Sequence, residues 1–321
     1  MSTPGLAAEL LDCVGAATRR GIRPSVRSIH LPRGFAAGSR DAEFCAVELD
    51  DGCIGFSFVL LGDTLPGLAT EAGIASLPGR PVAEVAAWYA EPAAARRALG
   101  LAAINALTGS VFRRSGYRPN DAADSLGLIA PLPADHIGMI GLFRPLVGRI
   151  LEAGARLTVA ELKPELAQPG ERFRVTLDPG ELAACNKIVS TSTLLLNDTL
   201  DAVLAACRHA GRFAIIGPSA GCMPDPLFRR GVDSLGGTEV VDCFFNPAAP
   251  TGHEPDFSSV DAAHRALVEQ VVEVDPEFVE RYLNDGDVDP SELHAPLEQA
   301  LREGHLIPIC FVSARNGAGV A

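Results

Sequence analysis

The sequence is poor in lysine. Only two lysines, Lys163 and Lys187, occur among its 321 residues, and the formal net charge is −13. Nucleic-acid binding depends on clustered Lys and Arg side chains that neutralise phosphates. A nucleic-acid partner is therefore not expected.

Long hydrophobic segments are also missing. The sequence contains no run of about 18 consecutive apolar residues, the length that a membrane-spanning helix needs. Residues 1–11 carry no basic segment followed by an apolar core, as a signal peptide would. We therefore expect a cytoplasmic protein with no membrane partner.

Cysteine pairs of the C-x-x-C type are absent. The eight cysteines are scattered, at positions 13, 45, 53, 185, 207, 222, 243 and 310. This spacing argues against both a disulfide framework and a zinc ribbon. Most of these side chains are expected to be buried small apolar groups.

Between residues 136 and 242, short apolar runs end in polar or glycine-containing clusters and give way to helical spacing. We predict strands at Ile137–Ile140, Arg156–Ala160, Lys187–Val189 and Arg212–Ile216, with a fifth candidate at Glu239–Val241. Strands this apolar are expected to be covered by helices on both faces. The pattern predicts an α/β fold with a Rossmann-like parallel sheet, whose ligand would lie beyond the carboxyl ends of the strands.

Charge and composition divide the chain into three parts. Residues 251–321 contain 14 Asp and Glu against 4 Arg, a net charge of −10, so the rest is only slightly acidic. A Pro- and Gly-rich segment near residues 247–255 marks this boundary, and a weaker one lies near residues 115–135. We predict domains at residues 1–120, 130–250 and 256–321.

The first domain is predicted to be α+β. Its predicted elements are a helix at Thr3–Arg20, extended runs at Val26–Leu31 and Phe44–Leu49, a hairpin turn at Asp50–Gly52, and helices at Val82–Tyr89 and Pro92–Thr108. Asn105 lies within the apolar run LGLAAINAL, where a buried amide must find partners. Those partners are either the neighbouring backbone or a ligand.

Two glycines and an acid mark the start of the parallel sheet. Gly138 and Gly141 permit close backbone approach, and the following helix N-terminus could hold an anion. Glu161 follows Gly141 by twenty residues, where many nucleotide-binding sheets keep an acid for ribose hydroxyls. The full G-x-G-x-x-G fingerprint is absent, so the alternative is that the glycines serve packing and Glu161 is solvated or paired with an arginine such as Arg144.

Two later loops belong to the same edge. They are STSTLLLNDTLD after the third predicted strand and GPSAGCMPDPLF after the fourth. A polar or anionic ligand could be surrounded by the hydroxyl, amide and backbone groups of Thr191–Thr193, Asn197, Gly217 and Ser219. The alternative, equally weighted, is that these residues are helix caps and turns.

Cys222 is the candidate residue both for metal binding and for nucleophilic catalysis. It stands in a loop at the expected ligand edge, and Cys185, Asp225 and His136 could come near it, but no spacing resembles a tetrahedral metal site. A nucleophilic Cys222 would need a histidine base, and none is placed by the sequence to serve it. A structural role is favoured for each of these residues.

Five segments together carry a resemblance to a known family. They are LGLAAINAL, IGMIGLFRPLV, VAELKP, STSTLLLNDTLD and IIGPSAGCMPDPLFRRGVDSLGG. The chain resembles, over residues 10–245, the two-domain bacterial and archaeal family named for heavy-metal chelation. That resemblance implies a small α+β domain like the N-terminal domain of enolase, followed by a Rossmann-like domain. It implies a cleft between them, lined by Asn105, Gly141, Glu161, Thr193, Asn197, Gly217, Pro218 and Ser219.

Residues 256–321 are similar instead to part of the GTPase domain of elongation factor G, with Ser313 and Ala314 matching its S-A loop. The phosphate-binding motif G-x-x-x-x-G-K-[ST] is absent, so GTPase activity is not expected. This acidic segment is expected to be mainly helical.

Three functional hypotheses remain. The leading one is a protein that binds a metal, a metal complex or an anionic metabolite in the cleft, with a transition metal ion as the candidate cofactor. The second is an enzyme, a transferase or synthase, that uses a nucleotide-like cofactor at the sheet edge and places a ribose at Glu161. The third is a protein that acts by association alone, and a homodimer is left open.

Overall fold

The computed structural model describes residues 5–32, 43–119, 126 and 128–238. These residues belong to one compact unit, which ends at Val240. The predicted domain at residues 256–321 and the predicted strand at Glu239–Val241 lie outside the described residues.

A three-stranded antiparallel sheet forms the centre of the first domain. Strands β1 (Val26–His30), β2 (Phe44–Leu49) and β3 (Ile54–Phe58) pair in the order β1-β2-β3. The predicted hairpin between β2 and β3 is confirmed. Its turn uses a left-handed Gly52 (φ 84°) and the Asp51 carboxylate, which accepts a hydrogen bond from the Cys53 N–H at 3.1 Å.

Helices cover this sheet. They are α1 (Leu6–Arg19), α2 (Thr64–Thr70), η1 (Ile74–Ser76), α3 (Val82–Ala86), η2 (Ala87–Ala90) and α4 (Ala94–Ser115). Helix α4 runs seven residues beyond its predicted end, because Gly109 and Ser110 continue the helix and Gly116 (φ 69°) ends it. It packs tightly on β3: a Cβ added to Gly55 would lie 2.2 Å from the Ala102 carbonyl oxygen.

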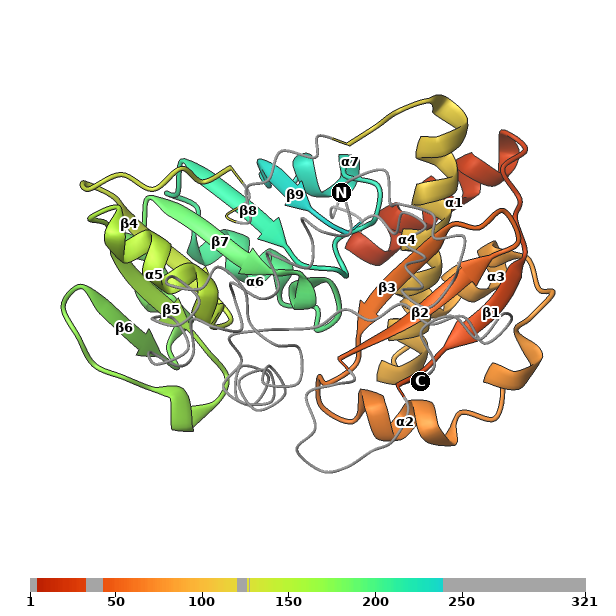
Figure 1. The fold of residues 1–321 in the computed structure, drawn as a ribbon, viewed down its shortest axis with the longest axis horizontal. Coiled ribbons are helices and arrows are strands. Elements are labelled where there is room, and N and C mark those ends of the chain that lie inside the picture. Colours follow the sequence, from red (N-terminus) through yellow and green to blue (C-terminus); the bar gives the residue numbers. More distant parts are fainter. Residues whose placement is uncertain (1–4, 33–42, 120–125, 127, 239–321) are drawn as a thin grey trace, which may run out of the picture. The chain divides into compact units, whose positions relative to one another are not determined.

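The second domain contains a parallel sheet, as predicted, and this sheet has six strands (Figure 1). Its strands are β4 (His136–Ile140), β5 (Arg156–Ala160), β6 (Phe173–Thr176), β7 (Lys187–Thr191), β8 (Arg212–Ile216) and β9 (Ser234–Gly236). They pair in the order β6-β5-β4-β7-β8-β9. This is the 3-2-1-4-5-6 order of doubly wound sheets, and the switch point lies between β4 and β7.

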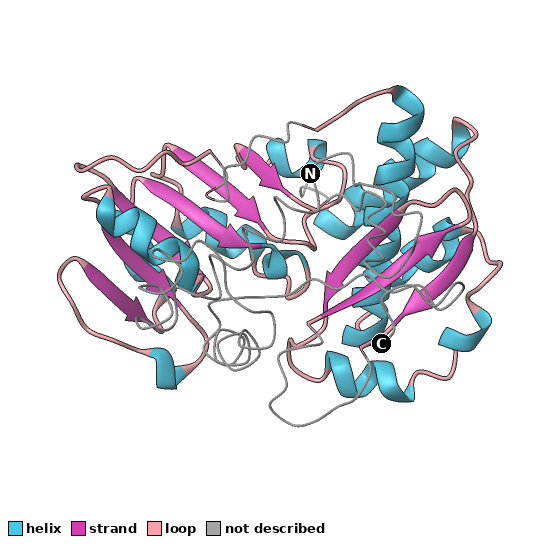
Figure 2. Cartoon of the chain, viewed as in Figure 1, coloured by secondary structure: helices cyan, strands magenta, loops and turns pink. Residues whose placement is uncertain are grey.

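Side chains from alternate positions of these strands enter two different cores. Ile188 packs into the core that continues into the first domain, whereas Val189 packs into a second core with β4, β5 and α5 (Arg144–Glu152). Short helices complete the domain: η3 (Pro164–Leu166), η4 (Pro179–Ala184), η5 (Ser192–Leu195), α6 (Leu200–Ala206) and α7 (Asp225–Phe228). Figure 2 shows helices and strands alternating along this half of the unit.

The two domains share buried contacts as well as a core. The Tyr89 hydroxyl of η2 donates a hydrogen bond to the Leu195 carbonyl of η5. At the other end of the contact, both Arg229 and Arg230 pair with the Glu9 carboxylate at 2.8 Å. Within the described part of the chain, no helix combines the length and apolarity needed to cross a membrane.

Candidate functional site

The switch point places the loop after β4 beside the loop after β7. Gly141 follows β4 with a left-handed backbone (φ 76°), and its N–H donates to the Ala160 carbonyl at 2.9 Å. A Cβ added there would lie 3.2 Å from Cγ2 of Thr191. Gly141 and Thr191 therefore form adjacent parts of the carboxyl edge, as the sequence predicts.

Glu161 follows β5 at the same edge and organises the neighbouring loop. Its Oε2 atom accepts a hydrogen bond from the Leu142 N–H at 3.0 Å, and Oε1 accepts one from the Leu162 N–H at 2.8 Å. Each carboxylate oxygen accepts only this one bond from the described residues, although it can accept two. No described residue, Arg144 included, forms an ion pair with Glu161.

The η5 loop after β7 combines side chains that cap the backbone with a Thr193 hydroxyl that bonds to no described residue. Thr191 Oγ1 accepts a hydrogen bond from the Thr193 N–H at 3.3 Å, so it serves as the cap of η5. Asn197 Oδ1 accepts from the Thr199 N–H at 3.2 Å and from the Thr199 hydroxyl at 2.5 Å. The interpretation as caps and turns therefore holds for Thr191 and Asn197, whereas the half-buried Thr193 hydroxyl bonds to no described residue.

The loop after β8 is closed by contacts with the first domain. The Ser219 hydroxyl, fully buried, accepts a hydrogen bond from the Phe58 N–H at 2.8 Å. The Asn105 side-chain amide donates to the Phe56 carbonyl at 2.8 Å and to the Ser219 carbonyl at 2.9 Å. Asn105 and Ser219 thus meet as predicted, but they join the outer edge of β3 to the β8 loop.

Gly217 and Pro218 precede Ser219 in the same loop and are half-buried. Gly217 has a φ of 131°, and a Cβ added to it would lie 2.6 Å from the Ser192 hydroxyl oxygen. Only glycine fits there. Its N–H donates to the Gly236 carbonyl at 2.9 Å, so the loop is anchored to β9 as well as to the first domain.

The expected hollow facing the first domain is partly occupied by these contacts. The Tyr89 hydroxyl already bonds to the Leu195 carbonyl there. In addition, the Arg97 guanidinium donates to the Leu196 carbonyl at 3.3 Å and pairs with the Asp198 carboxylate. The protein groups therefore close the edge beyond β7 and β8. The portion beyond β4 and β5, with Gly141 and Glu161, keeps half-buried groups and an exposed Leu162.

The sequence also predicts that the turns at this edge begin at Gly138, Ser190 and Gly217. For Gly138 and Ser190 this prediction is wrong, because both are buried inside strands β4 and β7. Gly138 is required for packing instead: a Cβ there would lie 2.5 Å from the Ile188 Cδ1 atom. The turns begin at Gly141 and Ser192, three and two residues later.

Cys222 is a buried thiol. It is 2% exposed, and burial raises its pKa to about 12, so the neutral thiol dominates at neutral pH. His136 begins β4 and Cys185 precedes β7, which places both at the amino edge of the sheet, whereas Cys222 follows β8 at the carboxyl edge. Over the ranges that the structure describes, no three His, Cys, Asp or Glu side chains gather as metal ligands.

The cysteines themselves behave as small apolar residues. Six of them are described, all as free thiols, and five of the six are buried. The expectation that most cysteines are buried is confirmed for these positions.

A buried polar cluster at the amino edge of the sheet is not predicted by any local sequence pattern. Asp135, 5% exposed, accepts hydrogen bonds from Asn186 Nδ2 at 2.8 Å, from Lys187 Nζ at 2.7 Å and from the Leu132 N–H at 2.8 Å. Burial by itself raises the pKa of Asp135, but these three bonds and the Lys187 charge outweigh burial and hold the pKa below its usual value. The sequence offers one signal for this cluster: Lys187 is one of only two lysines in the chain.

Fold and edge together define an α/β protein in which one compact unit holds a small antiparallel sheet and a doubly wound parallel sheet with polar loops at its switch point. Two family models, both described as "Putative heavy-metal chelation", match residues 42–108 and residues 124–244. The chain belongs to this family. The first match covers strands β2 and β3 and most of α4, and the second covers the whole parallel sheet.

One curated relative matches part of the chain. An uncharacterised protein of Methanocaldococcus jannaschii is 29% identical over 150 residues, which are 46% of this chain and 55% of that protein. The match therefore spans about half the length of the curated relative.

Two solved structures of family members with unknown function also match. The one from Pyrococcus horikoshii has a TM-score of 0.50 at 19% identity and covers 74% of this chain and 88% of that chain. The one from Desulfitobacterium hafniense has a TM-score of 0.49 at 20% identity and covers 65% and 78%. At such identities, the Pyrococcus likeness shows a common fold.

The resemblance of residues 256–321 to elongation factor G finds no support in these comparisons, since the family models end at residue 244. The likeness of the first domain to the N-terminal domain of enolase stays a prediction.

Proposed function

We propose that this protein binds a metal complex or an anionic small metabolite at the carboxyl edge of its parallel sheet. The observation that carries the proposal is the edge beside the switch point, where Glu161 and Thr193 keep unused hydrogen-bonding capacity. In doubly wound sheets this crevice is where ligands bind. The family description, which names heavy-metal chelation, supports a ligand that contains a metal.

A metal complex suits this edge better than a bare ion. Structural and catalytic metal sites take three or four protein ligands, and no such group exists among the described residues. A complex brings its own ligands, so the protein needs only to hold the outside of it. The Glu161 carboxylate can accept hydrogen bonds from its hydroxyls or waters, and the Thr193 hydroxyl can donate to its anionic groups.

Freshly purified protein tests the proposal directly. Its metal content is measured by elemental analysis, and its unfolding temperature is recorded with Zn²⁺ or Ni²⁺, alone and as citrate complexes, and with citrate alone. A bound ligand at a hundred times its Kd stabilises by about 2.7 kcal/mol, which corresponds to roughly 5–10 °C here. We expect the larger shift with a complex or with citrate.

The variant Glu161→Gln should lose this shift in the unfolding temperature. A glutamine side chain has only one oxygen that accepts hydrogen bonds, whereas the Glu161 carboxylate has two. Glu165→Gln is the matched control, since Glu165 is exposed in η3 only four residues away. If purified protein holds no metal and no metal, complex or anion changes the unfolding temperature, the proposal is wrong.

A second candidate is an enzyme that uses a nucleotide-like cofactor. The position of Glu161 favours it, because an acid at the end of the second strand is where doubly wound sheets bind ribose hydroxyls. NAD⁺ and S-adenosylmethionine serve as probes in the same thermal assay, without metal. A shift with either cofactor that Glu161→Gln removes, and no shift with metal complexes, would select this candidate instead.

A further inference from the structure

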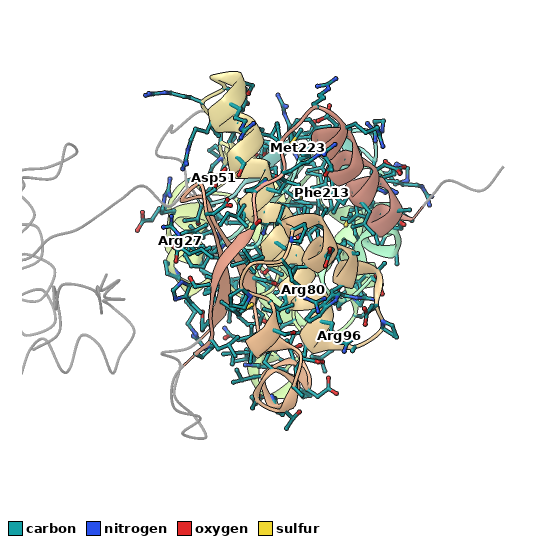
Figure 3. The ribbon with its side chains drawn as sticks, turned by 90° about the vertical axis from the view of Figure 1, so that its right-hand side faces the viewer. Arg27, Asp51, Arg80, Arg96, Phe213 and Met223 are labelled. Atoms are coloured by element: carbon teal, nitrogen blue, oxygen red, sulfur yellow. The ribbon has the colours of Figure 1, made fainter. Side chains whose placement is uncertain are left out.

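A cavity lies between helices α1 and α4, and its lining shares no residue with the candidate functional site. Its volume is about 330 Å³. Its wall consists largely of apolar side chains: Leu10, Val14, Ala17, Ile104, Leu107 and Met223. Met223, labelled in Figure 3, comes from the loop after β8 and completes the wall between the two helices.

The rim of the cavity is cationic. Arg20 follows the last residue of α1, and Arg114 lies in the last turn of α4; both are exposed and line the cavity. Neither arginine forms an ion pair with any residue that the structure describes. Arg114 Nη1 donates one long hydrogen bond, 3.3 Å, to the Gly21 carbonyl.

The polar side chains inside the cavity need no hydrogen-bond partner or counter-ion from a ligand. The Thr108 hydroxyl donates to the Ile104 carbonyl of its own helix at 2.9 Å. Cys13 is half-buried, and burial raises the pKa of its thiol above the ordinary value, so the side chain is neutral at pH 7. An uncharged apolar interior thus meets two unpaired cations at its mouth.

We propose that this cavity binds the hydrocarbon chain of a small amphiphilic carboxylate, with the carboxylate held by Arg20 and Arg114. Apolar pockets with a few polar groups at one end fix both the depth and the orientation of such ligands. The known range of small-molecule pockets is about 300–1,000 Å³, so this one accepts a medium-length single chain. It does not accommodate a two-chain lipid.

The arginines have an alternative role, because cations near helix C-termini stabilise the helix dipole. That role involves no ligand and predicts no dependence on chain length. The two roles are therefore separable by titration with a homologous series.

Isothermal titration of the full chain with hexanoate, octanoate and decanoate is the first measurement. Each added methylene should tighten binding about fourfold, the equivalent of ~0.8 kcal/mol, until the cavity is full. Octylammonium, which has the same chain and the opposite charge, should bind more weakly than octanoate. Octanol should lie between them.

Two pairs of variants test the wall and the rim. Ala16→Trp fills the cavity from the half-buried side of α1 and should abolish octanoate binding, whereas Ala8→Trp on the exposed side of the same helix should leave it unchanged. The double change Arg20→Gln with Arg114→Gln should weaken octanoate about fivefold with little effect on octanol. Arg19→Gln, an exposed neighbour that does not line the cavity, is its control.

Thermal unfolding of each variant shows whether it is folded, and a variant that fails to fold is replaced by Ala16→Phe. Absence of octanoate binding to the folded wild-type chain overturns the proposal. So does binding that survives Ala16→Trp, or binding as tight for octylammonium as for octanoate. If Ala16→Trp converts a dimer to a monomer and octanoate does not bind, the cavity is a contact with a second copy, and the proposal is again wrong.

Discussion

The carboxylates at the two ends of the parallel sheet differ in burial and in the hydrogen-bond partners that they have. At the amino end, Asp135 is 5% exposed and accepts bonds from Lys187, Asn186 and the Leu132 N–H. At the carboxyl end, Glu161 is half-buried and accepts two backbone N–H bonds, and no described residue supplies it with a cation. A polar group whose bonds are complete stabilises the fold, whereas one with spare capacity is available to a ligand.

The largest expected effect comes from breaking the amino-end cluster. Asp135→Asn removes the charge that pairs with Lys187, whose side chain is only 17% exposed, and leaves that ammonium without a carboxylate. Removing one partner of a buried ion pair costs about 3 kcal/mol. Urea unfolding should show this loss, and Asp12→Asn, an exposed acid on α1, should change the free energy of unfolding little. Equal effects of the two changes would contradict the structural role of the cluster.

The same cluster predicts how stability depends on pH. The pKa of Asp135 is lower in the folded than in the unfolded chain, so its contribution is complete above the unfolded pKa. It is lost as the pH falls through the folded pKa. The wild type should therefore lose more stability than Asp135→Asn between pH 5 and the acid transition, in unfolding experiments at a series of pH values. Parallel curves for the two proteins would show that Asp135 does not contribute this dependence.

The contact between the domains carries the next largest effect. Ser219→Ala leaves the partly buried Phe58 N–H without its acceptor. An unsatisfied buried donor costs about 1–3 kcal/mol. Chemical denaturation should show this loss, with Ser76→Ala, which removes an exposed hydroxyl, as the control. A neutral Ser219→Ala would mean that the Phe58 N–H finds water and that the edge of β3 is open there.

Much of this arrangement could be predicted from local patterns. The β2–β3 turn, four of the six parallel strands and the edge positions of Gly141 and Glu161 all follow from the residues themselves. Strand β6 was missed because Phe173–Thr176 has only four residues, two of them polar, and pairs only with β5 in the sheet. Strand β9 was missed because its three residues include a glycine.

The roles of Asn105, Ser219 and Asp135 could not be predicted in the same way. The Ser219 hydroxyl bonds to a residue 161 positions away, and Asn105 bonds to a carbonyl 114 positions away. Asp135 meets Lys187 across 52 positions. No local pattern contains such partners. The sequence can therefore show that a buried polar group needs a hydrogen bond, but it cannot show which residue supplies that bond.

Two glycine substitutions near the carboxyl edge should have smaller effects on stability, and these effects should have opposite signs. Gly141→Ala places a side chain in the left-handed region, with its Cβ 3.2 Å from Thr191, and should cost about 1 kcal/mol or more. Gly148→Ala, in helix α5 with nothing within 4 Å of the added Cβ, should instead stabilise by about 0.5–1 kcal/mol. Thermal unfolding of both variants measures the difference. Two changes of the same sign would show that the turn at Gly141 is not held in this conformation.

The smallest effect on stability should come from the hydroxyl that we assign to the ligand. Thr193→Val keeps the shape of the side chain and removes an Oγ1 atom that bonds to no described residue, so the free energy of unfolding should change by less than about 0.5 kcal/mol. The thermal shift with a metal–citrate complex or citrate should nevertheless fall, because the lost hydroxyl is a donor to the ligand. Thr199→Val is the counterpart: its hydroxyl is used in a 2.5 Å bond to Asn197, so it should lose stability and keep the ligand shift. If Thr193→Val behaves like Thr199→Val, the carboxyl edge is as structural as the amino edge, and the contrast between the two ends of the sheet fails.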